Sequence, residues 1–209
     1  MTDRRREILL AALAIADEQG LAAVSMRSVA ERVGVSAMAL YPHVGSKEAL
    51  LDGLVDVLLA ELPPALAGLP ADDPWARLTA LAHALRALAH RHPGAFALLL
   101  ARPSVTPDAV RATDTVYQAL LDVGVPEAMV PRIERLLSTF VLGFAASEVN
   151  GRFSAGTLNP RGRRAQFPGG EVLAHYRLAE HLDNPIDWDA EFAADLQDLR
   201  AVVEAVRVH

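Results

Sequence analysis

The segment SMRSVAERVGVSAMALYPHVGSK, residues 25–47, carries the strongest structural signal in this chain. It predicts two short helices joined by a tight turn and followed by the start of another helix. Ala30 is small, Gly34 accepts a turn conformation and Leu40 is apolar, which are the properties needed where two helices cross at a steep angle. The segment is therefore predicted to be a helix-turn-helix, a motif that presents its second helix to the major groove of DNA.

Composition limits the class of protein that surrounds this motif. The chain has 209 residues, of which 52% are hydrophobic, so it can bury a sizeable core and is not predicted to be disordered. It has no cysteine, which excludes disulfides and thiolate metal sites and favours a reducing, cytoplasmic compartment. We expect no signal peptide, because Arg4, Arg5 and Arg6 lead into an amphipathic segment. We also expect no membrane span, because no run of about 18 apolar residues is present.

Charge is distributed unevenly along the chain. The net charge of −6 at first argues against a nucleic-acid partner. Residues 1–50, however, contain six basic and six acidic residues, so the whole acidic excess lies in the remainder. A neutral, locally basic N-terminal part on an acidic body is compatible with DNA binding through that part alone.

Almost the whole chain has a helical pattern, since alanine and leucine are abundant and no segment alternates like a strand. Ser25, Ser36 and Ser46 are expected to cap successive helices. The pattern predicts an all-α fold with a three-helix helix-turn-helix domain (1–46), a connecting helix (47–62) and a larger helical domain (63–209). Outside the motif, helices are expected at 5–19, 74–91, 94–101, 107–123, 127–153, 171–182 and 187–206, with a loop at 154–170.

Residues 34–51, GVSAMALYPHVGSKEALL, extend the motif into a longer pattern. This pattern is similar to Gly-Val-Ser-x-x-x-Leu-Tyr-x-His-(Val/Phe)-x-x-Lys-(Glu/Asp)-x-Leu-Leu, the hallmark of the DNA-binding domain of the TetR family of bacterial transcriptional repressors. The first 60 residues of the chain resemble that domain. The resemblance implies an all-helical homodimer whose larger domain has a ligand cavity and supplies the dimer interface.

The resemblance also assigns DNA contacts residue by residue. Pro42 departs from the family, which commonly has a larger polar or aromatic residue there, so a contact at this position is not expected. The small residues in the second helix of the motif favour thymine-methyl contacts and shape readout over bidentate hydrogen bonds, except through Arg27. Taken singly, each charged or polar candidate is equally well explained as a solvated surface side chain. The predicted DNA-binding residues are Arg27 (base or phosphate), Ala37, Met38 and Ala39 (base edges), Tyr41, His43 and Lys47 (DNA backbone), and Ser36, to which no particular DNA group is assigned.

The C-terminal part matches the family in architecture rather than in residues that specify a ligand. Helices 127–153 and 187–206 carry long apolar stripes and are the expected dimer interface, although such stripes would equally pack inside one subunit. Pocket candidates are the larger side chains on otherwise Ala/Leu-rich helices, and core packing is the alternative for each. These candidates are His83, Phe96, Tyr117, Phe140, Phe144, Glu148 and Tyr176.

No cofactor or metal is expected. Tetracycline-binding members of the family use a histidine near an Arg-Pro turn, and no histidine lies between Phe96 and Asp122 here. No nucleophile or phosphate-loop motif indicates an enzyme. The sequence thus predicts a ligand-responsive regulator, by resemblance a repressor, that binds a pseudo-palindromic operator as a dimer. The alternative is a DNA-binding regulator without a small-molecule ligand that is gated by a protein partner.

Overall fold

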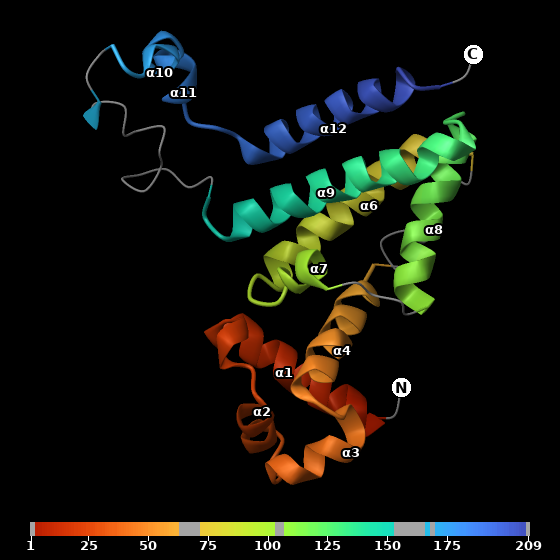
Figure 1. The fold of residues 1–209 in the computed structure, drawn as a ribbon, viewed down its shortest axis with the longest axis vertical. Coiled ribbons are helices and arrows are strands. Elements are labelled where there is room, and N and C mark those ends of the chain that lie inside the picture. The colour runs from red at the N-terminus through yellow and green to blue at the C-terminus, as the bar shows by residue number, and fades with distance from the viewer. Residues whose placement is uncertain (1–2, 63–71, 103–106, 153–165, 168–169, 208–209) are drawn as a thin grey trace.

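The computed structural model describes residues 3–62, 72–102, 107–152, 166–167 and 170–207, and all regular structure in these ranges is helical. The predicted all-α fold is therefore confirmed. A small N-terminal head lies at the lower end of Figure 1, a larger body lies above it, and α4 joins the two. In the head are α1 (Asp3–Gln19), α2 (Met26–Arg32), the 3₁₀ turn η2 (Ala37–Leu40), α3 (Tyr41–Val44) and α4 (Lys47–Leu59). In the body are α6 (Pro74–Arg91), α7 (Leu98–Ala101), α8 (Pro107–Asp122), η3 (Glu127–Met129), α9 (Val130–Val149), α10 (Leu173–Arg177), α11 (Ala179–Leu182) and α12 (Trp188–Glu204).

Local hydrogen bonds explain where the helices of the head begin and end. The Ser25 side chain accepts a hydrogen bond from the Ser28 backbone N–H, and the Ser28 hydroxyl accepts one from the Ser25 N–H, both at 3.0 Å. These two bonds form a capping box that starts α2. At its end, Gly34 adopts a φ of 72°, and the Val35 N–H donates to the Ala30 carbonyl, so the chain reverses. Ser46 caps α4 by accepting from the Ala49 N–H at 3.1 Å.

The second helix of the motif differs from the prediction. Instead of one helix capped by Ser36, the chain forms η2 and then the four-residue α3, and the Ser36 side chain makes no capping bond. Pro42 supplies the reason, because it has no N–H to donate to the carbonyl four residues earlier, at Met38. The predicted Ser36 cap is therefore wrong, while the caps at Ser25 and Ser46 are confirmed.

A proline without a backbone N–H also divides the expected helix 127–153. Pro131 cannot donate to the Glu127 carbonyl, so the segment begins as η3 before α9 starts at Val130. The helix α9 ends at Val149, and residue 153 lies outside the described residues. The expected helix 94–101 is also shorter, since turns run through residues 93–97 before α7, and the expected helix 171–182 is two short helices, α10 and α11.

The apolar stripes of α9 and α12 pack inside the subunit. The α6 and α9 helices lie alongside one another, α8 stands against them, and α12 covers their outer side (Figure 1). Phe192 of α12 is fully buried with Phe144 of α9, and Val203 of α12 is fully buried with Ile133 of α9. The two stripes thus meet inside the subunit at Phe192 and Val203, whereas Leu196 and Leu199 of α12, and Val206 just beyond it, are only partly buried.

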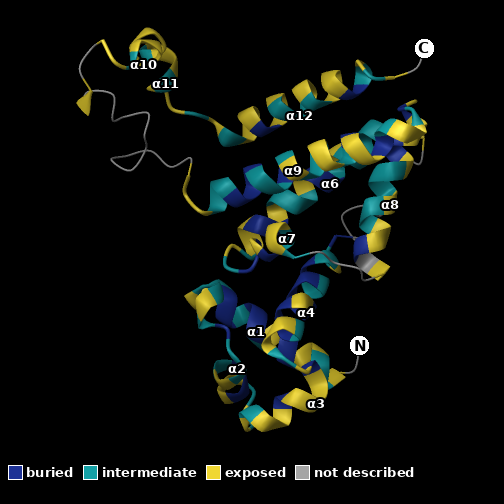
Figure 2. Ribbon diagram, in the orientation of Figure 1, coloured by how far each residue is buried: buried dark blue, intermediate teal, exposed yellow. Residues whose placement is uncertain are grey.

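Head and body share one continuous core. Ala95, Phe96 and Leu98, at the start of α7, are buried together with residues of α1 and α4. Figure 2 shows this buried zone running from the head through α4 into the lower body, with the exposed residues outside it. A movement in the body can therefore reach the head through packed side chains rather than through a loose linker.

Candidate functional site

The helix-turn-helix presents an exposed surface around η2 and α3. Met38 is 75% exposed, and Ser36 and Ala39 are also exposed, although Ala37 is partly buried against the core of the head. Tyr41 and His43 are exposed on α3, and Lys47 is exposed at the start of α4. Leu40 and Val44 are buried on the opposite side and fix this element onto the head. The predicted phosphate-binding residues therefore lie on one short stretch of accessible chain.

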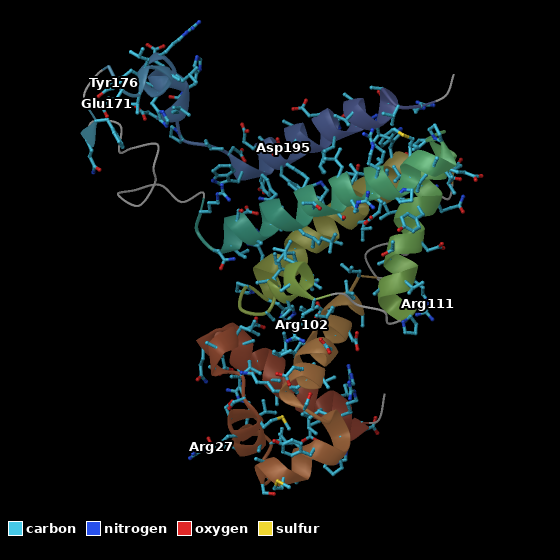
Figure 3. All side chains as sticks on the ribbon, in the orientation of Figure 1. Arg27, Arg102, Arg111, Glu171, Tyr176 and Asp195 are labelled. Atoms are coloured by element: carbon cyan, nitrogen blue, oxygen red, sulfur yellow. The ribbon has the colours of Figure 1, made fainter. Side chains whose placement is uncertain are left out.

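Two arginines act on this surface in different ways. Arg27 points out of α2 (Figure 3), its side chain is 87% exposed, and it donates to Glu31 at 2.9 Å, one helical turn away. Contact with DNA would require Arg27 to leave Glu31, and an exposed ion pair between residues one helical turn apart is weak. Arg5 of α1 instead donates to the backbone carbonyl of His43 at 3.0 Å and anchors the end of α3.

An apolar cavity of about 230 Å³ lies directly behind the head. Its walls come from α4, α6, α7, α8 and α9, so the helix that begins at Lys47 forms one side of it. Four of the described lining residues carry polar groups, namely Arg102, Thr113, Glu134 and Ser138, and the others are apolar. We call this space the head-side cavity; its lining residues are Val55, Leu59, Leu62, Leu81, Leu85, Leu99, Arg102, Ala109, Ala112, Thr113, Val116, Glu134, Ser138 and Leu142.

Arg102 connects the head-side cavity to the head. It lines the cavity and lies where the end of α7 meets α4 (Figure 3). Its guanidinium donates to the Asp52 carboxylate at 2.6 Å and to the Glu48 backbone carbonyl at 3.3 Å. Glu48 directly follows Lys47, so one side chain spans from the cavity wall to the edge of the predicted DNA surface.

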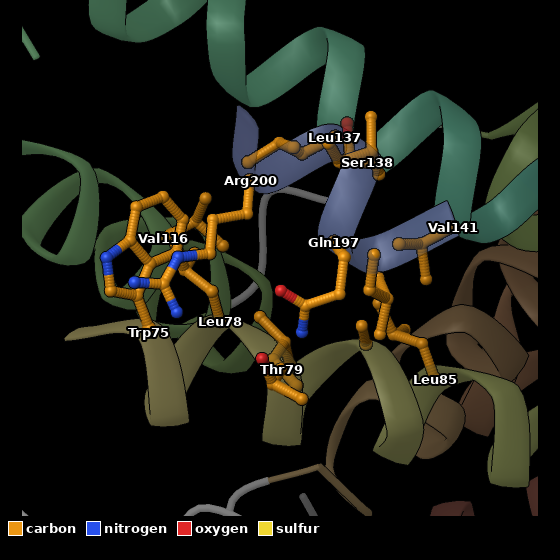
Figure 4. A pocket seen from close by; sticks show the side chains of 14 residues that line it. Trp75, Leu78, Thr79, Leu85, Val116, Leu137, Ser138, Val141, Gln197 and Arg200 are labelled. Atoms are coloured by element: carbon orange, nitrogen blue, oxygen red, sulfur yellow. The ribbon is translucent and has the colours of Figure 1, made fainter. Parts of the chain in front are cut away.

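A second, smaller chamber of about 100 Å³ adjoins the first, sharing Leu81, Leu85, Val116 and Ser138. It lies between α6, α8, α9 and α12 (Figure 4), where Gln197 extends from α12 toward α6. The Arg200 guanidinium sits over the Trp75 ring, 4.8 Å from its centroid. The two chambers therefore have these four shared side chains as common walls.

The turn that follows α6 joins body to head most tightly. The His92 ring faces Asp17 of α1 through Nδ1 at 2.7 Å and Glu61 through Nε2 at 3.0 Å, and Arg91 donates to Glu61 at 2.9 Å. Gly94 lies so close to α1 that a Cβ there would overlap the Ala16 carbonyl. We call this contact the turn–α1 joint, residues 91–94 against Ala16, Asp17 and Glu61.

A buried ion pair braces the far side of the body. Arg86 donates two hydrogen bonds to Glu148, at 2.6 and 2.8 Å, and their side chains are only 11% and 12% exposed. These bonds hold the pKa of Glu148 below its ordinary value, and His90 adds a contact at 3.1 Å. The Arg86 guanidinium also lies over the rings of Phe144 and Phe192, at 5.8 and 5.1 Å.

The predicted pocket residues fall in several places, and none of them lines either chamber. His83 and Glu148 border an open cleft of about 790 Å³ between α6, α9 and the start of α12. Phe96 is buried between head and body, and Tyr117 packs on the core cluster around Leu120. Phe140 and Phe144 contact each other at 5.9 Å between ring centroids, whereas Tyr176 is exposed on α10.

Sequence reasoning missed the residues of the head-side cavity, although a signal was present. Thr113, Glu134 and Ser138 are polar residues within helical stripes that are otherwise apolar, for example Glu134, Ser138 and Leu142 at successive i, i+4 positions. Of the side chains chosen by size, Phe96 and Tyr117 belong to core clusters, whereas His83 and Glu148 border the open cleft. No group of three or more His, Asp or Glu side chains suited to a metal occurs in the described part of the chain. Within those ranges, no helix is long and apolar enough to cross a membrane.

Comparison with known proteins agrees with this arrangement. Residues 8–54 match the model of the tetR family of bacterial regulatory proteins, and residues 78–167 match the tetracyclin repressor-like C-terminal domain. A helix-turn-helix (HTH)-type transcriptional regulator from Saccharopolyspora erythraea is 31% identical over 195 residues, which cover 84% of this chain and 81% of the relative. The HTH-type transcriptional repressor DrrR1 from Streptomyces coeruleorubidus is 33% identical over 144 residues, covering 68% of this chain and 52% of that protein.

Solved structures show the same fold. The Streptomyces coelicolor protein ActR, crystallised in complex with actinorhodin, superposes with a TM-score of 0.81 at 24% identity. The match covers 98% of this chain and 97% of that one. At this identity the likeness establishes the fold alone.

Proposed function

The chain belongs to the TetR family of bacterial transcriptional regulators, and from this premise we propose that it is a homodimeric repressor released from its operator by a small, largely apolar effector. The family membership makes it a DNA-binding regulator rather than an enzyme. One relative, DrrR1, is a repressor by name, and the structural neighbour ActR was crystallised with actinorhodin, which supports both parts of the proposal.

One observation carries the proposal: α4 is at once a wall of the head-side cavity and the support of the DNA-binding element. Val55, Leu59 and Leu62 face the cavity from the α4 segment, and Lys47 and Ser46 begin the same helix. An effector that fits the cavity better in one position of α4 than in another shifts the head toward that position. Because two heads must match an operator about one DNA turn apart, such a shift lowers DNA affinity.

Within this proposal the DNA contacts are those assigned from the sequence. Tyr41, His43 and Lys47 bind phosphates, Arg27 exchanges Glu31 for the DNA, and Met38 meets base edges together with the small residues beside it. The head offers few side chains for bidentate base contacts, so operator choice rests on methyl contacts and DNA shape.

The dimer is proposed to form through the outer faces of α9 and α12 rather than through their buried stripes. Leu136 of α9 and Val202 of α12 are exposed apolar side chains, and exposed alanines such as Ala194 and Ala201 make the outer face of α12 small and smooth. Small side chains let helices of two subunits approach closely, and the pairing places two heads on one DNA molecule.

The proposal is tested by DNA binding with and without effector. The DNA flanking the chain's own gene is tiled into labelled duplexes, and fluorescence anisotropy measures which duplex binds in a sequence-dependent manner. Mass spectrometry of small molecules that co-purify with the protein supplies the effector. A Leu142→Trp variant, which fills the head-side cavity, is expected to bind the operator but to be insensitive to that effector. Sequence-specific binding that no bound small molecule releases would instead favour gating by a protein partner.

A further inference from the structure

We propose that the effector is an organic cation, a flat or compact apolar molecule whose positive charge lies against Glu134 in the head-side cavity. The inference rests on the proposed function, since it names the class of ligand for that cavity. It begins with a carboxylate that, among the described lining residues, only Glu134 on α9 supplies.

Glu134 is partly buried and has no counter-ion in the described structure. It forms no hydrogen bond or ion pair with any described residue, in contrast to Glu148, which is held by Arg86 on the same helix bundle. Ser138 lies one helical turn further along α9 and also faces the cavity, where its hydroxyl makes only a long 3.4 Å bond to a backbone carbonyl. These two groups place acceptor oxygens side by side on an apolar wall.

The one basic side chain of the lining does not neutralise this carboxylate. Arg102 is paired with Asp52 at 2.6 Å and also donates to the Glu48 carbonyl. Because the Arg102 guanidinium is engaged by Asp52, which lies outside the lining, the Glu134 carboxylate is the charge left without a partner among the described lining residues.

The unpaired Glu134 carboxylate determines which class of ligand the cavity favours. The rest of the lining is chiefly Leu, Val and Ala, so an occupant displaces water from the carboxylate without offering it a protein partner. A neutral occupant leaves a desolvated, unpaired carboxylate, and an anionic occupant adds repulsion. A cationic occupant replaces the lost hydration with a charge-assisted contact, so it is the class that the site favours.

The test compares two ligands that share a ring system and differ in charge: 10-methylacridinium, a permanent cation, and acridine, which is neutral in mildly alkaline buffer. Calorimetric or fluorescence titrations measure the Kd of each for the full chain. Glu134→Gln removes the charge with little change of shape, and Glu127→Gln, at an exposed position outside the cavity, is the matched control. Leu142→Trp shows whether binding takes place in the cavity.

We expect the wild-type chain and Glu127→Gln to bind the cation about tenfold more tightly than acridine. Glu134→Gln is expected to abolish that preference while leaving the acridine Kd unchanged or lower. Equal affinity for the two dyes in the wild type, or a preference that survives Glu134→Gln, would overturn the inference. If acridine binds without charge preference and Leu142→Trp abolishes that binding, the cavity is a ligand site and only the preference for a cation is refuted. If neither dye binds, the cation inference is refuted, while the proposed function is decided separately by the operator titration with co-purified small molecules.

Discussion

Replacing Gly94 by alanine tests the turn–α1 joint directly. A Cβ at this position would lie 1.8 Å from the Ala16 carbonyl oxygen and 3.0 Å from the Asp17 backbone nitrogen. Both are backbone atoms of α1, so no side-chain rotation relieves the overlap. The turn must retreat from α1 by roughly 1 Å or more to restore van der Waals contact, and His92 is drawn away from Asp17 with it.

Overpacking of this kind costs about 1–3 kcal/mol. For a chain of this size that corresponds to a fall of about 2–12 °C in the melting temperature. Since the joint fixes α1 to the body, we also expect the Gly94→Ala variant to bind operator DNA but to respond less to effector, by up to the 1–3 kcal/mol typical of such coupling. Differential scanning fluorimetry measures the melting temperature, and fluorescence anisotropy of operator DNA with and without effector measures the response to effector.

Gly170 provides the control, because a Cβ there meets nothing within 4 Å. Gly170→Ala is expected to melt and respond like the wild type. A Gly94→Ala protein with unchanged melting temperature and unchanged effector response would show that the turn is not pressed against α1, and the joint would then have no role in coupling.

Three further predictions concern charged groups. Lys47→Ala should weaken binding to every DNA sequence nearly equally, because it removes a phosphate contact. Anisotropy at several salt concentrations should show that the slope of log affinity against log salt falls by about 1 per subunit. A loss of affinity confined to one DNA sequence would contradict the phosphate contact. Glu148→Ala leaves the buried Arg86 without its main partner and should lower the free energy of unfolding in urea by about 3–5 kcal/mol. Asp189 is the second, mostly exposed partner of Arg86, so Asp189→Ala should cost about 1 kcal/mol or less. Burial, with the nearby carboxylates of Glu191 and Asp198, raises the pKa of Asp195, so folding favours its protonated form and stability falls as the pH rises through that pKa. Asp195→Asn should therefore raise the melting temperature at neutral pH, with the gain disappearing in acid; an equal gain at every pH would refute the electrostatic origin.

The head could be predicted from sequence because its determinants are local. The Ser25 cap, the turn at Gly34 and the buried Leu40 depend on neighbours within a few residues. The second helix of the motif differs from the prediction because Pro42, besides offering no DNA contact, lacks the backbone N–H that a continuous helix requires.

The cavity could not be predicted in the same way, because it is defined by which helix faces meet. Phe96 and Tyr117 are large side chains that fill space between packed elements, so they do not line the cavity. Glu134 and Arg102 form one wall only after the end of α7, α8 and α9 come together, and no sequence spacing relates them. Side-chain size therefore indicates core, whereas a polar residue within an apolar stripe is the better sign of a cavity.

The arrangement of ties between head and body determines how an effector can act. Arg102 holds the start of α4 through Asp52 and Glu48, and the turn–α1 joint holds α1 and the end of the α4 segment through His92. Within the described residues, these polar contacts hold the head at two separate points, and a rotation of the head requires at least one of them to break. The head-side cavity borders Arg102 but not His92. A bound effector therefore acts first on the contact of Arg102 with α4, and the turn–α1 joint is the point about which the head rotates. Head rotation about α1, rather than detachment of the head, is the motion that this geometry favours.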